Sequence, residues 1–155
     1  LEPKPQSDIP IWIGGGSEGM LQLAGELGDG WIPPDYTADR YEERWRRIRY
    51  YLHRANRDED HFMKALFAHV SYASTRREAE ENLRRVERIR NGYNPNFGRP
   101  EIDAKEVSIL TPQTLHSWLD NYSALVSYFV LSFLTQGASD ALERIRLFAL
   151  ELDYH

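Results

Sequence analysis

Short apolar segments alternate with amphipathic helical segments along this chain, and the alternation limits the possible folds more than any other feature. Strands are expected at residues 11–13, 31–32, 65–72 and 128–134. Each is followed by helical periodicity, so the strands should run parallel and be joined by helical crossovers. The strands are almost continuously apolar, which predicts that both of their faces are buried. The sequence therefore predicts an α/β fold of four parallel strand–helix units.

Apolar stripes and capping residues define the helical segments. The pattern after Thr75 is a capping box, and Thr111-Pro112 has the form of an N-cap followed by proline at the first helical position. Residues 1–8 read as a linker and residues 91–110 as a loop or insertion, within a single domain covering 1–155. The residues expected to face inward are Met20, Leu21, Ala24, Leu27, Tyr41, Trp45, Ile48, Leu52, Ala79, Leu83, Val86, Ile89, Leu115, Leu119, Tyr122, Leu142, Ile145, Phe148 and Leu152.

Residues 9–21 read as a short buried strand, three consecutive glycines and the first turn of a helix. Glycine lets the backbone approach a ligand closely and adopt positive φ. The free N–H groups at a helix start, with the positive end of the helix dipole, favour an anion. One interpretation is a phosphate site at the carboxyl end of a parallel strand. The other is a tight turn that binds nothing, and a glycine run alone does not separate the two.

The composition excludes several classes of function. The formal net charge of −5 argues against nucleic acid as a main partner, because phosphate neutralisation requires a basic surface. Arginines are frequent between residues 40 and 57, but the interleaved acids favour a salt-bridged, solvent-exposed face. The absence of cysteine excludes disulfides, thiolate metal ligands and cysteine nucleophiles. No apolar run is long enough to span a membrane, and a cytoplasmic location is expected.

Three segments carry a resemblance to a known family through their order. The first is Pro10-Ile11-Trp12-Ile13-Gly14-Gly15, followed by an apolar helix and Gly28-Asp29-Gly30-Trp31. The second is Thr111-Pro112-Gln113. The third is Phe129-Val130-Leu131-Ser132-Phe133, followed by a helix with Ile145, Arg146, Leu147 and Phe148. In this order they resemble the bacterial-luciferase-like oxidoreductases, which use FMN or the deazaflavin coenzyme F420.

The resemblance implies a (β/α)8 TIM barrel, of which this chain would form the carboxyl-terminal half, strands five to eight. A whole barrel needs about 250 residues, so the 155 residues agree with half a barrel, and a fragment of a longer protein is expected. The family's catalytic groups lie mostly in the amino-terminal half, so this chain alone is expected to be inactive. It would contribute the cofactor phosphate-binding loop of an FMN- or F420-dependent oxidoreductase.

In the family, the glycine segment after the fifth strand contacts the cofactor phosphate. The resemblance therefore implies that the cofactor-binding residues here are Gly14, Gly15, Gly16, Ser17 and Glu18. Glu18 departs from what a phosphate site needs, because a carboxylate repels a phosphate unless it faces away. Its alternative role is that of a first-turn acid favoured by the helix dipole.

Half a barrel leaves two open strand edges and an uncovered apolar face. Unpaired edges recruit other strands, and an exposed apolar patch marks an interaction surface. We therefore expect a homo-oligomer or pairing with an amino-terminal half-barrel. The alternative hypothesis is a non-catalytic half-barrel binding or assembly module, in which the glycine loop is only a turn.

Two further side chains have both a functional and a structural interpretation. His69, in the expected strand 65–72, would either line the barrel or be a satisfied core histidine. Ser132, near the end of the last strand, would either approach the cofactor or pack as a small core residue. No histidine pair has metal-ligand spacing with a supporting carboxylate.

Overall fold

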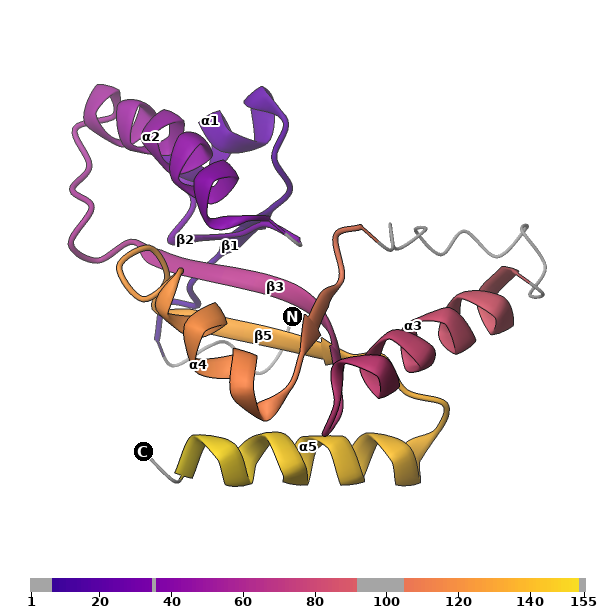
Figure 1. Cartoon of the computed structure of the whole chain (residues 1–155). Helices are drawn as coiled ribbons and strands as arrows, with labels where there is room; N and C mark the ends of the chain where they lie inside the picture. The colour runs from indigo at the N-terminus through magenta and orange to yellow at the C-terminus, as the bar shows by residue number, and fades with distance from the viewer. Residues whose placement is uncertain (1–6, 35, 92–104, 154–155) are drawn as a thin grey trace. The chain divides into compact units, whose positions relative to one another are not determined.

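A computed structural model of the chain describes residues 7–34, 36–91 and 105–153, with residues 88–91 and 153 described by their backbone alone. Strands and helices alternate along it, as Figure 1 shows. The elements in chain order are β1 (Trp12–Gly14), α1 (Glu18–Leu27), β2 (Gly30–Ile32), α2 (Ala38–Arg54), β3 (Met63–Tyr72), α3 (Arg76–Asn91), β4 (Ser108–Leu110), α4 (Pro112–Asp120), β5 (Tyr128–Phe133) and α5 (Ala138–Asp153).

Contacts divide the chain into two compact units, which we describe one at a time. The first unit comprises residues 1–66 and 125–129. In this unit β1 pairs with β2, and β2 pairs with the start of β3, both in parallel. Helices α1 and α2 lie side by side (Figure 1). Their close approach is possible because Gly25 has no side chain: a Cβ there would lie 2.6 Å from the Cβ of Tyr51.

The core of the first unit is built by one face of each helix and by β2. On α2 the predicted stripe is confirmed, since Tyr41 and Ile48 are fully buried and Trp45 and Leu52 nearly so. Leu21 and Ala24 of α1 and Trp31 of β2 are also fully buried. The spacing of apolar residues by three and four thus decides which side of α2 meets the strands.

The second unit comprises residues 67–124 and 130–155. Here the end of β3 pairs in parallel with β4, and the amide of Leu134, just after β5, donates to the carbonyl of Val70. The Phe148 ring of α5 packs edge-on against Tyr72 and Phe133. Thr111 begins α4 as predicted, with its amide 2.9 Å from the hydroxyl of Thr114 and proline at the start of the helix.

The predicted strands and their parallel pairing are confirmed, and one strand lies outside the prediction. Strand β4 forms within the segment 91–110 that we expected to be a loop or insertion. It lies in the short apolar run Val107–Leu110, which is too brief for a residue pattern to separate a strand from a loop. Residues 92–104 of that segment, and residues 1–6 of the expected linker, lie outside the described residues. The assignment of the whole chain to one domain stays a prediction.

Several residues expected to face inward are exposed instead. On α5 only Phe148 of the predicted stripe is buried, whereas Leu142, Ile145 and Leu152 are exposed. The prediction was wrong because α5 is apolar around more of its circumference than the strands of its own unit can cover. Leu27 of α1, 71% exposed, is a similar correction. Strand β5 is also not buried on both faces, since Tyr128 and Val130 are exposed.

Candidate functional site

The glycine segment forms the turn from β1 to α1, within the first unit. Gly14 ends β1, Gly15 has φ of +89°, and Ser17 is the extended N-cap residue of α1. Positive φ is available to glycine without steric cost, so Gly15 is suited to this turn. The carbonyl of Ser17 accepts from the amides of Met20 and Leu21, which closes the first helical turn.

Trp31 fixes the orientation of the peptide between Gly15 and Gly16. Its fully buried indole Nε1 donates to the carbonyl of Gly15 at 2.7 Å. The carbonyl and the following N–H of a trans peptide point in opposite directions, so the N–H of Gly16 points away from the indole. Among the described residues, the amides of Gly16, Ser17, Glu18 and Gly19 have no hydrogen-bond acceptor. Four donors are therefore available at the positive end of α1.

Gly16 is held against the side chain of Tyr36. A Cβ on Gly16 would lie 1.6 Å from the hydroxyl oxygen of Tyr36 and 2.8 Å from its Cζ. Tyr36 is itself buried, packs edge-on against Trp31, and has the guanidinium of Arg40 over its ring at 4.2 Å. Only glycine fits at position 16 without displacing this packed tyrosine.

The carboxylate of Glu18 is engaged by α2. It accepts from Nε of Arg47 at 3.1 Å and from the hydroxyl of Tyr51 at 2.6 Å. The hydrogen bond from Arg47, then that from Tyr51, lowers the pKa of Glu18, so it stays ionised. The carboxylate of Glu18 thus joins α1 to α2, a contact that the sequence analysis did not predict. A role of Glu18 in cofactor binding stays a prediction.

The opposite end of α1 is also fixed by side chains of the first unit. The guanidinium of Arg57 donates to the carbonyls of Gly25 and Gly28 at 2.9 and 2.7 Å. Asp29 accepts from the amide of Ile11 through its carboxylate and donates its own amide to the Ile11 carbonyl. Sequence reasoning did not identify Arg57, Tyr36 or the hydrogen bond of Trp31, because each partner lies 16 to 32 positions away.

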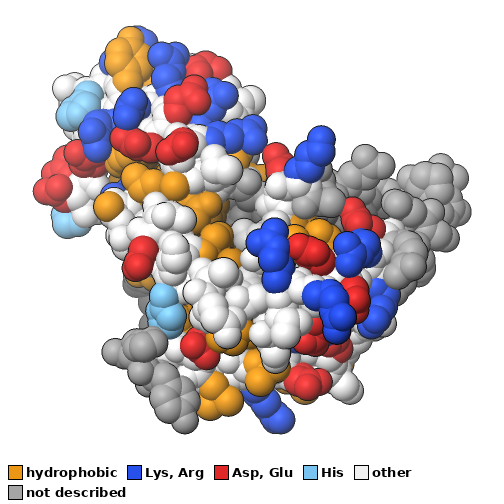
Figure 2. Space-filling view, viewed as in Figure 1, with side chains coloured by type: hydrophobic (Ala, Val, Ile, Leu, Met, Phe, Trp, Pro, Cys, Tyr) orange, Lys and Arg blue, Asp and Glu red, His pale blue; other side chains and the backbone are white. Residues whose placement is uncertain are grey.

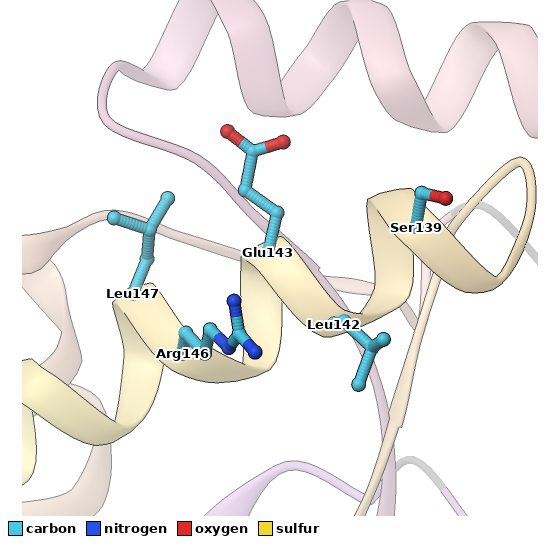
Figure 3. Close-up of a pocket in the computed structure, with 5 residues that line it drawn as sticks. All are labelled: Ser139, Leu142, Glu143, Arg146 and Leu147. Atoms are coloured by element: carbon cyan, nitrogen blue, oxygen red, sulfur yellow. The ribbon is translucent and has the colours of Figure 1, made fainter.

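The other candidates are not brought to the glycine loop by any described contact. His69, half-buried on β3, packs edge-on against Phe67, and Ser132 is half-buried on β5. No cluster of three or more His, Asp or Glu side chains suited to a metal occurs within the ranges that the structure describes. A hollow on α5 is lined by side chains of that one helix (Figure 3), including Glu143 and Arg146, and no set of polar groups converges on it.

The charged residues of α2 form pairs across its exposed face, as the interleaved sequence predicts. Arg46 pairs with Glu42 and Arg49 with Glu59, at 2.6 and 2.8 Å. Figure 2 shows basic and acidic side chains intermixed over the face in view. The absence of a nucleic-acid partner stays a prediction.

A family model described as luciferase-like monooxygenase matches residues 1–141. The chain belongs to this family. Its membership confirms the resemblance carried by the three sequence segments. A comparison with curated protein sequences finds no significant match. Within the described ranges, no helix combines the length and the apolar character needed to cross a membrane.

Solved structures of luciferase-like enzymes share the fold at low sequence identity. An F420-dependent secondary alcohol dehydrogenase has a TM-score of 0.71 at 14% identity, covering 94% of this chain and 49% of the dehydrogenase. The coenzyme F420-dependent tetrahydromethanopterin reductase of Methanopyrus kandleri has a TM-score of 0.68 at 19% identity, covering 93% of this chain and 50% of the reductase.

A long-chain alkane monooxygenase has a TM-score of 0.70 at 18% identity, covering 99% of this chain and 43% of the monooxygenase. The chain thus spans about half the length of these solved structures. The expected fold class is confirmed: the chain is a parallel α/β structure that corresponds to half of a luciferase-like barrel.

Proposed function

We propose that this chain supplies the cofactor phosphate-binding loop of a flavin- or deazaflavin-dependent oxidoreductase, with Gly14, Gly15, Gly16 and Ser17 around the phosphate. The cofactor is FMN or coenzyme F420. The observation that carries the proposal is the row of unpartnered amides from Gly16 to Gly19 at the positive end of α1. The hydroxyl of Ser17, which makes no capping hydrogen bond, is a further donor.

The residues present fit a phosphate in space and in charge. The Tyr36 hydroxyl fills the side-chain direction of Gly16 and leaves its amide without an acceptor among the described residues, and the Trp31 indole holds the preceding carbonyl away from that amide. Glu18, the acidic residue that begins α1, is paired with Arg47. Its negative charge is therefore compensated at this helix start, which favours an anion there.

Names of similar structures support the choice of cofactor. Two carry F420 in their names, and a third is a riboflavin lyase solved with a modified FMN. A bound flavin or deazaflavin would supply the hydride-transfer chemistry. The residues of this chain would bind the phosphate and orient the cofactor, and we assign no catalytic residue among them. The reaction and substrate of a whole enzyme depend on elements beyond the half-barrel described.

Titration with FMN, coenzyme F420 and riboflavin tests this proposal. Riboflavin has the isoalloxazine ring of FMN but no phosphate, so it separates ring binding from phosphate binding. We expect FMN or F420 to bind, and FMN binding to exceed riboflavin binding by about 10-fold or more, because charge-assisted hydrogen bonds to the phosphate are lost with riboflavin. Fluorescence of the ring measures all three. A chain that binds neither FMN nor F420 contradicts the proposal.

The exposed apolar residues favour a second function, that of an assembly module. In the first unit Ile9, Ile11 and Leu27 are each at least 60% exposed. The amide and the carbonyl of Ile11 both form hydrogen bonds with Asp29, which lies beside β2. The amide and the carbonyl of Trp12, the next residue, therefore point to the opposite edge of β1. We propose that this edge pairs with another strand, either in a second copy of the chain or in an amino-terminal half-barrel.

Light scattering at micromolar concentration tests the assembly proposal. We expect the purified chain to form dimers or larger species, and Ile11→Lys with Leu27→Lys to shift it toward monomer, because charged side chains at an apolar interface are desolvated at a cost. Tyr50→Lys is the control, since Tyr50 is an exposed aromatic residue of α2, away from that edge. A monomer that unfolds cooperatively would refute the proposal.

A further inference from the structure

Three arginines form a row along one face of α2 beside the glycine loop. Arg40, Arg44 and Arg47 are spaced by four and three positions, so their side chains leave the helix on the same side. At one end of the row, Arg47 holds the carboxylate of Glu18, the first residue of α1. At the other end, Arg40 lies over the ring of Tyr36.

The two ends of this row bracket the free amides of the loop. The hydroxyl of Tyr36 occupies the space beside Gly16, while Glu18 lies two residues further along the chain. Arg44 lies one helical turn from each of the other two arginines. Its side chain therefore leaves α2 between the arginine that lies over Tyr36 and the arginine that pairs with Glu18. In agreement, the charge of Arg44 contributes to lowering the pKa of Glu18.

Within the described residues, Arg44 differs from its neighbours on α2 because it has no acidic partner. Arg46, Arg47 and Arg49 each form an ion pair. The Nε of Arg44 is buried, and within the described part of the chain it has no hydrogen-bond acceptor. Its helical neighbours at three and four positions are Arg40, Tyr41, Arg47 and Ile48, none of them acidic. Arg44 therefore has a charged donor that no described residue uses, and it is available to an anion.

A second buried donor without a partner lies one turn from Arg44. Tyr41 is fully buried, and its hydroxyl has no acceptor among the described residues. Its ring packs 4.8 Å from that of Trp31, the residue that orients the loop through Gly15. Burial raises the pKa of Tyr41, so the hydroxyl keeps its proton and stays a donor. Helix α2 thus carries two donors without a partner among the described residues, one helical turn apart.

We propose that Arg44 is a ligand of the anion held by the amides of Gly16 to Gly19, and that it makes the site selective for a cofactor that carries a phosphate group. The inference rests on the proposed function and deepens it. With Arg47 neutralised by Glu18, the site offers the full positive charge of Arg44 together with the partial charge of the α1 terminus. This positive charge favours a phosphate group over the uncharged hydroxyl that riboflavin has in its place.

Binding of FMN and riboflavin to an Arg44→Gln variant tests the proposal. We expect Arg44→Gln to weaken FMN binding by about 10- to 100-fold, the loss typical of a charge-assisted hydrogen bond. Riboflavin binding should stay unchanged, so the preference for FMN shrinks. Arg44→Lys should restore part of the preference for FMN, because lysine keeps the positive charge but lacks the planar guanidinium group. Arg46→Gln is the matched control, since Arg46 lies on the exposed side of α2 and pairs with Glu42.

A measurement on the unmodified chain covers the case in which a variant does not fold. Titration with inorganic phosphate, followed by NMR, should shift the Nε–H signal of Arg44 together with the amide signals of Gly16 and Ser17. If the amides shift and FMN is preferred, but Arg44 does not respond and Arg44→Gln binds FMN normally, the role of Arg44 is refuted and the proposed function stands. If the unmodified chain binds neither FMN nor F420 and no amide shifts, both fail.

Discussion

Replacing Trp31 with alanine should lower the free energy of unfolding by about 3–5 kcal/mol, the range for removing a fully buried aromatic side chain. Trp31 lies at the centre of the first unit, where Tyr36 and Tyr41 pack against its ring. The alanine variant would leave a cavity between β2 and α2. Denaturant unfolding, followed by circular dichroism, measures the change.

Trp31→Phe isolates the hydrogen bond from the packing. Phenylalanine keeps an aromatic ring but leaves the carbonyl of Gly15 without its donor. We expect a loss of about 1–3 kcal/mol, the penalty for an unsatisfied buried acceptor with some loss of packing. Trp12→Phe is the matched control, because the indole N–H of Trp12 is buried and has no acceptor in the described chain. If both phenylalanine variants are equally stable, Trp31 does not hold the loop through its hydrogen bond.

Gly16→Val should abolish measurable FMN binding and destabilise the first unit. The first side-chain carbon would overlap the hydroxyl of Tyr36, so either the tyrosine leaves its buried position or the loop moves. Overpacking of this kind typically lowers the free energy of unfolding by about 1–3 kcal/mol. A displaced loop also misaligns the amides, and we expect FMN affinity to fall by about 100-fold or more, as several charge-assisted bonds are lost together.

Gly19→Ala provides the opposite control within the same short segment. A Cβ on Gly19 meets nothing within 4 Å, and the residue lies in the first turn of α1. Alanine there should raise stability by up to about 1 kcal/mol through helix propensity, with FMN affinity retained. Gly16→Ala combined with Tyr36→Phe should recover part of the loss, because the hydroxyl is the nearest obstacle. Equal FMN affinity in Gly16→Val and Gly19→Ala would show that the loop does not hold the phosphate.

Local patterns were sufficient for the features that a single element determines. The stripe Tyr41, Trp45, Ile48 and Leu52 follows from helical periodicity, and all four residues are buried. The position of the glycine turn follows from an apolar strand, a glycine run and a helix start that are adjacent in the sequence. Each of these inferences needs only neighbouring residues, because the physical cause acts within one or two helical turns.

Features that depend on distant residues could not be obtained in this way. The side chain of Tyr36 excludes any side chain at Gly16, although the two residues are 20 positions apart. Arg47 donates to Glu18 across 29 positions of sequence. The exposure of Leu142 and Leu152 depends on which strands lie beside α5, and the residue pattern is the same whether or not that face is covered. The strand β4 is defined by its pairing with β3 rather than by its own composition.

The guanidinium of Arg57 has a consequence for the mechanics of α1. It occupies the negative pole of the helix by donating to two carbonyls there, while the positive pole is the end proposed to take the anion. Side chains of the first unit thus hold α1 at both ends, through Glu18 at its start and through the carbonyls of Gly25 and Gly28 at its finish. An anion at the proposed site would therefore meet donors whose positions are set before it arrives, so binding would cost little ordering of the backbone.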